Sequence, residues 1–188
     1  MCRPSKRVVA RAFLWLGLGS VYALPFLNVR GAFDAFIKID GVPGESTDDK
    51  HTGWIEVQSF HHGISQPATV GPSIPPDGRA NHEDLRIIHT LDKASPKLAL
   101  YCCNAEHIPS VQLQLVRATD RETFYTITLS DVIVSSVSPG GSVSDVLPLE
   151  EVSFNYAKIE WDYRIYDPGT GVWTSIKTGW DVLANEEQ

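Results

Sequence analysis

Cysteine is scarce in this chain of 188 residues, which contains only Cys2, Cys102 and Cys103. An odd count with two adjacent cysteines excludes the disulfide framework that holds small secreted domains together. No Cys-x-x-Cys spacing is present, so the usual zinc and redox motifs are excluded as well. We interpret the cysteines as small buried residues, because free cysteines are most often found inside proteins.

The short motifs of common enzymes are also missing: the sequence has no His-Glu-x-x-His, P-loop or Gly-x-Ser-x-Gly pattern. His61 and His62 are adjacent on an expected strand, so they point to opposite faces and cannot bind one metal ion from that strand alone. We interpret the remaining histidines as unrelated surface or hydrogen-bonded residues; they are His51, His82, His89 and His107. The sequence therefore predicts no metal site and no cofactor.

Two pairs of neighbouring carboxylates, Glu83 with Asp84 and Glu150 with Glu151, lie at the starts of expected strands. Neighbours on a strand face apart, whereas a glycosidase needs two converging carboxylates about 5–9.5 Å apart. An enzyme built across several strands is thus the weakest of the functions considered, and we predict that the protein is not an enzyme.

Composition and charge narrow the class further. The chain is 43% hydrophobic and 21% charged, which is typical of a globular protein and excludes collagen-like, coiled-coil and wholly disordered chains. Residues 1–31 contain five basic side chains and no acidic one, whereas the rest has 11 Lys and Arg against 23 Asp and Glu, a net charge of −12. So acidic a body excludes nucleic acid as the expected partner, because binding to phosphates depends on Lys and Arg.

The first 31 residues differ from the rest. Residues 1–11 are basic, residues 12–24 are apolar, and Val21-Tyr22-Ala23 has the spacing of small residues that signal peptidase recognises. The apolar run is shorter than the roughly 20 residues that span a bilayer, so we expect no stable membrane insertion. Two interpretations stay open for this segment, a secretory signal peptide or an extension from a misplaced start, and residues 32–188 form one expected domain.

From residue 33 onward, short alternating runs rich in Val, Ile, Thr and aromatic residues are separated by Gly, Pro and Asp clusters, which predicts a mostly β body. Two of the expected strands exceed the usual three to ten residues, so they should bend, bulge or follow a barrel wall. The expected strands are residues 33–40, 54–64, 84–91, 111–118, 123–136, 150–166 and 175–182.

One helix is expected after Ser95, which would cap it, with Pro96 at the first helical position. Apolar residues then recur at helical spacing, at Leu98, Tyr101, Cys102 and Ala105, and residues 107–109 should end the helix. A single short helix cannot form a core, so it should lie against the sheet or close one end of a barrel.

The strand expected at 150–166 has apolar side chains at both parities. Val152, Phe154 and Tyr156 share one parity, and the opposite one holds Asn155, Ala157, Ile159, Trp161 and Tyr163. This pattern predicts that both faces are covered, one by the core and the other by a neighbouring subunit.

Residues 66–81 contain four prolines and two glycines and no periodicity. Unstructured connections of this length are uncommon inside compact domains and are often functional, so we interpret this one as a contact loop.

Several blocks of the sequence resemble the Hcp (haemolysin-coregulated protein) family of bacterial type VI secretion. They include FDAFIKIDGVPGEST at 33–47 and WIEVQSFHHGISQ at 54–66, followed in the same order by 92–100, 132–142, 148–161 and 178–181. The resemblance implies an all-β fold, a small β-barrel of two sheets with one flanking α-helix. It also implies a homo-oligomer, a hexameric ring whose rings stack into a tube.

What the family does is implied in the same way. The tube is tipped by a valine-glycine repeat spike protein and is pushed out by a contractile sheath, and its lumen carries or chaperones small effector proteins. The protein would then be secreted by the type VI system after assembly in the cytoplasm. A signal peptide at residues 1–31 conflicts with this order and leaves a periplasmic route open.

The resemblance also assigns residues. Ser59 and His61 would lie near the lumen and contact cargo, and six copies of His61 would change charge near pH 6.5, where histidines titrate. The loop that reaches a neighbouring subunit or ring would include Gln66, Pro67, Pro72, Pro75, Pro76 and Asp77. The alternative function is a monomeric secreted β-barrel binding module.

Overall fold

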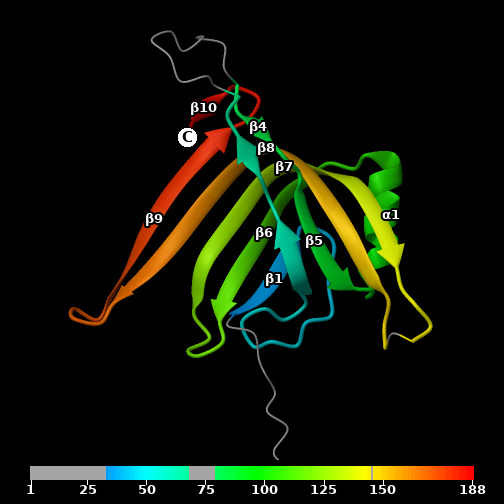
Figure 1. The fold of residues 1–188 in the computed structure, drawn as a ribbon, viewed down its shortest axis with the longest axis horizontal. Helices are drawn as coiled ribbons and strands as arrows, with labels where there is room; N and C mark the ends of the chain where they lie inside the picture. Colours follow the sequence, from blue (N-terminus) through cyan, green and yellow to red (C-terminus); the bar gives the residue numbers. More distant parts are fainter. Residues whose placement is uncertain (1–32, 68–78, 145) are drawn as a thin grey trace, which may run out of the picture.

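The computed structural model describes residues 33–67, 79–144 and 146–188, so the expectations for residues 1–31 lie outside the described residues. Within the described ranges the chain forms ten strands and one helix (Figure 1). In chain order these are β1 (Phe33–Ile39), β2 (Ile55–His61), β3 (Ile64–Ser65), β4 (Asn81–His82), β5 (Leu85–Thr90), α1 (Ser95–Asn104), β6 (Ile108–Arg117), β7 (Thr123–Gly140), β8 (Leu149–Asp167), β9 (Val172–Asp181) and β10 (Glu186–Glu187).

Six of these strands close into a barrel. The large sheet has the order β10-β9-β8-β5-β2-β1-β6-β7, and a further pairing of β7 with β8 closes the six strands from β8 to β7 into a barrel. β9 and β10 extend the sheet beyond the barrel on the β8 side, and β3 and β4 form a second, two-stranded sheet. The predicted all-β fold, a small barrel with one flanking helix, is confirmed.

The core lies inside this barrel. The wall strands contribute alternating side chains to it, such as Ile37 from β1, Leu85 from β5, Val111 from β6 and Leu129 from β7, all fully buried. Burying a side chain of this size contributes about 1.5–3 kcal/mol relative to leaving it in water. The alternation of apolar and polar residues therefore determines which face of each short strand points into the barrel.

β7 and β8 have 18 and 19 residues and pair with each other along almost their whole length. Their register runs from Tyr125 opposite Tyr163 to Gly140 opposite Leu149, with an irregularity between Val134 and Ser136. The prediction that such long strands bulge and follow a barrel wall is confirmed.

The prediction that a neighbouring subunit covers the second face of β8 is wrong for its central residues. Phe154 and Tyr156 are buried at one parity, and Ala157 and Ile159 are buried at the other, all within this one chain. The change of parity occurs opposite Asp131, which has a left-handed backbone (φ 54°). At this point the buried residues of both strands change from one parity to the other. Strict alternation of inward and outward side chains does not predict such a change.

α1 packs against β7 on the outside of the barrel (Figure 1), and Leu98 is fully buried beneath it. The prediction that Ser95 caps the helix is wrong: Ala94 holds the cap position and Ser95 lies buried in the first turn. Asp92 organises this start instead, because its Oδ1 accepts the N–H of Ala94 at 2.8 Å.

The helix ends earlier than expected, at Asn104, because Ala105 adopts a left-handed conformation with φ 52°. Residues 107–109 do not end it; β6 already begins at Ile108. Pro109 is tolerated in β6 because it precedes Val111, where the pairing of β6 with β1 begins. The N–H that proline lacks is therefore not needed for a hydrogen bond to β1.

Of the cysteines expected to be buried, Cys102 is half-buried and Cys103 is exposed on α1, so that expectation is wrong for Cys103. Among the described residues, no helix combines the length and the apolar character that crossing a bilayer would require.

Candidate functional site

Ser59 and His61 lie on the outward face of β2. Ile55 and Val57 point into the barrel, and a register shift between Val57 and Ser59 keeps Phe60 packed against the core further along the strand. Ser59 and His61 are consequently both exposed to solvent. They line a small depression of about 140 Å³, together with Phe60, Arg86, Ile88 and Glu151.

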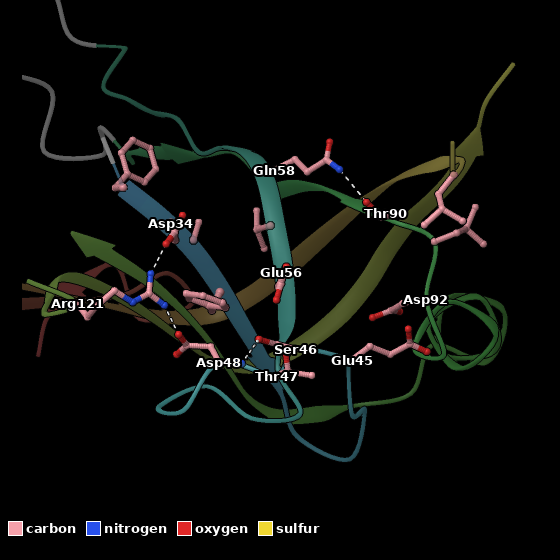
Figure 2. Close-up of a pocket in the computed structure, with 16 residues that line it drawn as sticks. Asp34, Glu45, Ser46, Thr47, Asp48, Glu56, Gln58, Thr90, Asp92 and Arg121 are labelled. Carbon is pink, nitrogen blue, oxygen red and sulfur yellow. Dashed lines mark hydrogen bonds and ion pairs between the residues drawn. The ribbon is translucent and has the colours of Figure 1, made fainter. Parts of the chain in front are cut away.

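A larger groove of about 1010 Å³ lies over β1 and β2 and the segments that flank them (Figure 2). We call it the acidic groove, since its lining includes the carboxylates of Asp34, Glu45, Asp48, Glu56 and Asp92. Arg121 is the one basic side chain among the described residues that line it. This surface attracts positively charged groups.

Arg121 joins two walls of the acidic groove, because its guanidinium donates to both Asp34 and Asp48 (Figure 2). Asp48 also pairs with His51, whose Nδ1 lies 2.6 Å from Asp48 Oδ1 and whose ring stacks on Phe36 at 4.3 Å. Burial alone would raise the pKa of Asp48, but the hydrogen bonds from His51 and Arg121 and the charge of Arg121 hold it below its usual range. This network fixes the β1–β2 connection against the barrel.

The acidic groove was not predicted from the sequence. Asp34 and Glu56 come from neighbouring strands, whereas Asp48 and Asp92 come from connections far apart in the chain. The one available signal was the excess of acidic residues in the body, which does not say where they meet.

The histidines are surface or hydrogen-bonded residues, as interpreted from the sequence, but two of them share a partner. His62 and His82 meet at the hydroxyl of Tyr156, with His62 Nε2 at 2.6 Å and His82 Nδ1 at 3.1 Å from Tyr156 Oη. His89 is buried and pairs with Glu150. Within the described ranges, no group of three or more His, Cys, Asp or Glu side chains is arranged to hold a metal ion.

The acidic pairs face apart as predicted. Glu150 points into the barrel and is buried, whereas Glu151 beside it is exposed. Glu83 and Asp84 likewise have separate partners, since Glu83 lies beside His61 and Asp84 accepts hydrogen bonds from Ser135 and Asn155.

Of the residues assigned to the contact loop, Gln66 and Pro67 follow β3 and are exposed. Pro72, Pro75, Pro76 and Asp77 lie outside the described residues. The far end of the connection is tied to the barrel by Arg79, which donates to the carbonyl oxygens of Val182 (3.2 Å) and Leu183 (2.8 Å).

The β8–β9 hairpin reaches away from the barrel (Figure 1). It also exposes an apolar face. Tyr163, Ile165, Val172 and Ile176 share this face, because they lie at one parity of the paired strands, and they are 46%, 43%, 56% and 56% exposed. We call these four residues the hairpin face. It is apolar surface of the kind that a partner covers.

The opposite side of the hairpin has contacts between rings and cations. The Trp173 ring lies 5.1 Å from the ring of Tyr166 and beneath the guanidinium groups of Arg117 (5.3 Å) and Arg164 (5.4 Å). Trp173 is half-buried, whereas Tyr166 stays 44% exposed. The cation–π contacts therefore help to hold the end of the hairpin against β6.

Comparison with known proteins identifies the family. A family profile described as "Type VI secretion system effector, Hcp" matches residues 36–163. The chain is 34% identical to Protein hcp1 of Pseudomonas aeruginosa over 158 residues, which cover 82% of this chain and 98% of that protein. It is 29% identical to the Major exported protein of the same organism, over 72% of this chain and 84% of the relative.

A solved structure agrees with this identification. The crystal structure of Hcp1 from Salmonella typhimurium matches 84% of this chain and all of its own chain, with a TM-score of 0.71 and 34% sequence identity. Profile, sequence and fold thus agree on one assignment: the chain belongs to the Hcp family of type VI secretion proteins.

Proposed function

We propose that this protein is a structural subunit of the type VI secretion tube, which forms hexameric rings that stack and carry or chaperone small effector proteins in their lumen. The observation that carries the proposal is the hairpin face, an apolar surface that a lone subunit leaves in water. Membership of the Hcp family supports the same function.

In a ring, each subunit would present the hairpin face to a different surface of its neighbour. Such heterologous contacts form a closed ring when the rotations from one subunit to the next add up to a full turn. A stable contact buries about 1,200–2,000 Å² in total, and apolar area removed from water contributes about 25 cal/mol per Å². The hairpin face would form the apolar centre of this interface.

The remaining assignments follow from the ring. Ser59 and His61, on the outward face of β2, would contact cargo in the lumen. Gln66 and Pro67, with Pro72, Pro75, Pro76 and Asp77, would contact a neighbouring subunit or ring. A valine-glycine repeat spike protein and a contractile sheath would be the further partners, with secretion by the type VI system after assembly in the cytoplasm. The subunit would have no enzymatic activity, so any toxicity would come from its cargo.

The test measures the mass of the protein in solution. We expect the native chain to behave as a hexamer by native mass spectrometry and light scattering. Ile176→Asp places a charge on the hairpin face and should give single subunits. Leu100→Asp is the matched control, because Leu100 on α1 is 57% exposed and Ile176 is 56% exposed.

A native chain that stays a single subunit at every concentration would contradict the ring and favour the alternative, a monomeric secreted β-barrel binding module. Loss of the ring in both variants would show that the hairpin face is not the specific contact. Far-ultraviolet circular dichroism of each variant distinguishes dissociation from unfolding.

A further inference from the structure

His62 and His82 attach the β3–β4 ribbon to the wall of the barrel. His62 lies between β2 and β3, two residues before the ribbon begins, and His82 is the last residue of β4, so one histidine stands at each chain end of the ribbon. Both rings reach one hydroxyl on β8, since Tyr156 Oη lies 2.6 Å from His62 Nε2 and 3.1 Å from His82 Nδ1. This hydroxyl is the junction between ribbon and barrel.

The two hydrogen bonds set the number of protons at the junction. Tyr156 Oη has one proton, so it donates to one imidazole and accepts from the N–H of the other. The imidazole that accepts is then neutral, and each hydrogen bond contains one proton. A further proton on the accepting ring would leave two N–H donors facing the oxygen and would displace the tyrosine proton from its partner.

The surroundings oppose positive charge at this place. Burial lowers the pKa of His62, a positive charge on His82 or His61 lowers it further, and only the carboxylate of Glu83 acts in the opposite direction. Burial also lowers the pKa of His82. Whichever ring accepts the tyrosine proton is therefore favoured in the neutral form that this hydrogen bond requires.

On the barrel side, burial and then the charge of Asp84 raise the pKa of Tyr156, so its hydroxyl keeps its proton. Asp84 does not pair with either ring, because its Oδ1 accepts from Asn155 Nδ2 (2.8 Å) and its Oδ2 from Ser135 Oγ (2.5 Å). Tyr156 itself is buried, with its ring 5.8 Å from the ring of His62.

We infer that this junction is an acid-sensitive attachment: His62 and His82 hold the β3–β4 ribbon against Tyr156, and protonation of the ring that accepts the tyrosine proton releases the ribbon while the barrel stays folded. The sign follows from linkage. A histidine whose pKa is lowered by folding destabilises the attached state as the pH falls below about 6.5, where the released ring takes up its proton.

Hydrogen exchange of the full chain tests the inference, with protection factors compared at about pH 7.5 and about pH 5. The ribbon amides are the reporters, among them Glu83, whose N–H donates to the carbonyl of Gly63 at 2.9 Å. We expect their protection factors to fall several-fold at the lower pH, while Leu129 in the barrel wall keeps its protection. Equal protection of the ribbon at both pH values would overturn the inference.

Variants separate the junction from other acid effects. The double variant His62→Gln with His82→Gln keeps donors and acceptors but takes up no proton, so ribbon protection should lose its pH dependence. His107→Gln is the matched control, because His107 pairs with Asp131 instead (2.8 Å), and the native drop should remain. If the ribbon protection of the double variant fell between about pH 7.5 and about pH 5 as much as in the native chain, these histidines would not be responsible.

Tyr156→Phe provides a second route if the double variant does not fold. It keeps the buried ring and removes only the hydroxyl to which both imidazoles bond. The ribbon should then show, already at about pH 7.5, the low protection that the native chain has at about pH 5, with no further drop. A native-sized drop in Tyr156→Phe would also overturn the inference.

Discussion

His89 on β5 and Glu150 on β8 lie directly opposite each other inside the barrel, where they are 0% and 2% exposed. His89 Nε2 is 3.1 Å from Glu150 Oε2, and within the described residues His89 Nδ1 has no hydrogen-bond partner. Among the described residues, Glu150 is therefore the one side chain that hydrogen-bonds to this buried ring. Breaking such a pair is costly because the remaining group is left buried and unpaired, whereas replacing both groups is not.

Replacing Glu150 alone should destabilise the barrel more than replacing both residues. We expect Glu150→Leu to lower the free energy of unfolding by about 3 kcal/mol, and addition of His89→Leu to restore most of that loss. Glu151→Gln, on the exposed side of the same strand, should change it by less than about 0.5 kcal/mol. Urea denaturation measures all three, and a double variant less stable than Glu150→Leu would contradict this account.

Arg121 should stabilise the β1–β2 connection through its two carboxylate partners, Asp34 and Asp48. Because the three groups are partly exposed, we expect Arg121→Gln to lower the free energy of unfolding by about 1 kcal/mol or less at neutral pH. The difference should shrink in about 1 M salt, which screens charges beyond roughly 3 Å. A loss that is unaffected by salt would show that packing of the arginine, and not its charge, is responsible.

Asp48 should make this stabilisation depend on pH. Its pKa is held below the ordinary value, so the folded chain binds fewer protons here than the unfolded chain. The contribution is complete above about pH 4 and is lost as the pH falls through the lowered pKa. Asp48→Asn should remove this part of the acid dependence in denaturation curves, whereas Asp49→Asn, on the exposed neighbour, should leave it.

The sequence was sufficient to predict the barrel because short strands such as β1 and β5 place every second side chain in the core. Ile37 and Ile39 on β1, or Leu85 and Ile87 on β5, all point inward at a period of two, and that period alone identifies a half-buried strand. The phase change in β7 and β8 was not predictable in the same way. It depends on the left-handed backbone of Asp131, a conformation that aspartate tolerates but that no pattern announces.

The candidate sites were less predictable because they combine residues distant in the chain. His62 and His82 are separated by twenty positions, and the hydroxyl that joins them comes from β8. Strict alternation along β2 would place Ser59 and His61 inside the barrel; the register shift after Val57 turns them outward, and that shift belongs to the pairing of β2 with β5. Which surface of a ring they face depends on contacts between subunits and stays a prediction.

Gly44 is the position where the smallest added group should do most harm. A Cβ there would lie 2.3 Å from the carbonyl oxygen of Trp54 and 2.6 Å from a side-chain carbon of Ile55. Backbone cannot shift aside as a flexible side chain can, so Gly44→Ala should cost about 1–3 kcal/mol of unfolding free energy. Gly140→Ala, where nothing lies within 4 Å, should be nearly neutral in the same thermal or urea denaturation.

His61 should contribute to cargo binding if it lines the lumen of the proposed ring. Its imidazole is exposed on the outward face of β2, where it lies 3.3 Å from Glu83, so it can offer a hydrogen bond to a cargo protein. We expect His61→Ala to lower the retention of a small effector of the same secretion system several-fold in a pull-down. His107→Ala is the control, because His107 is similarly exposed and also pairs with a carboxylate. Equal retention by the native protein and by His61→Ala would exclude this role.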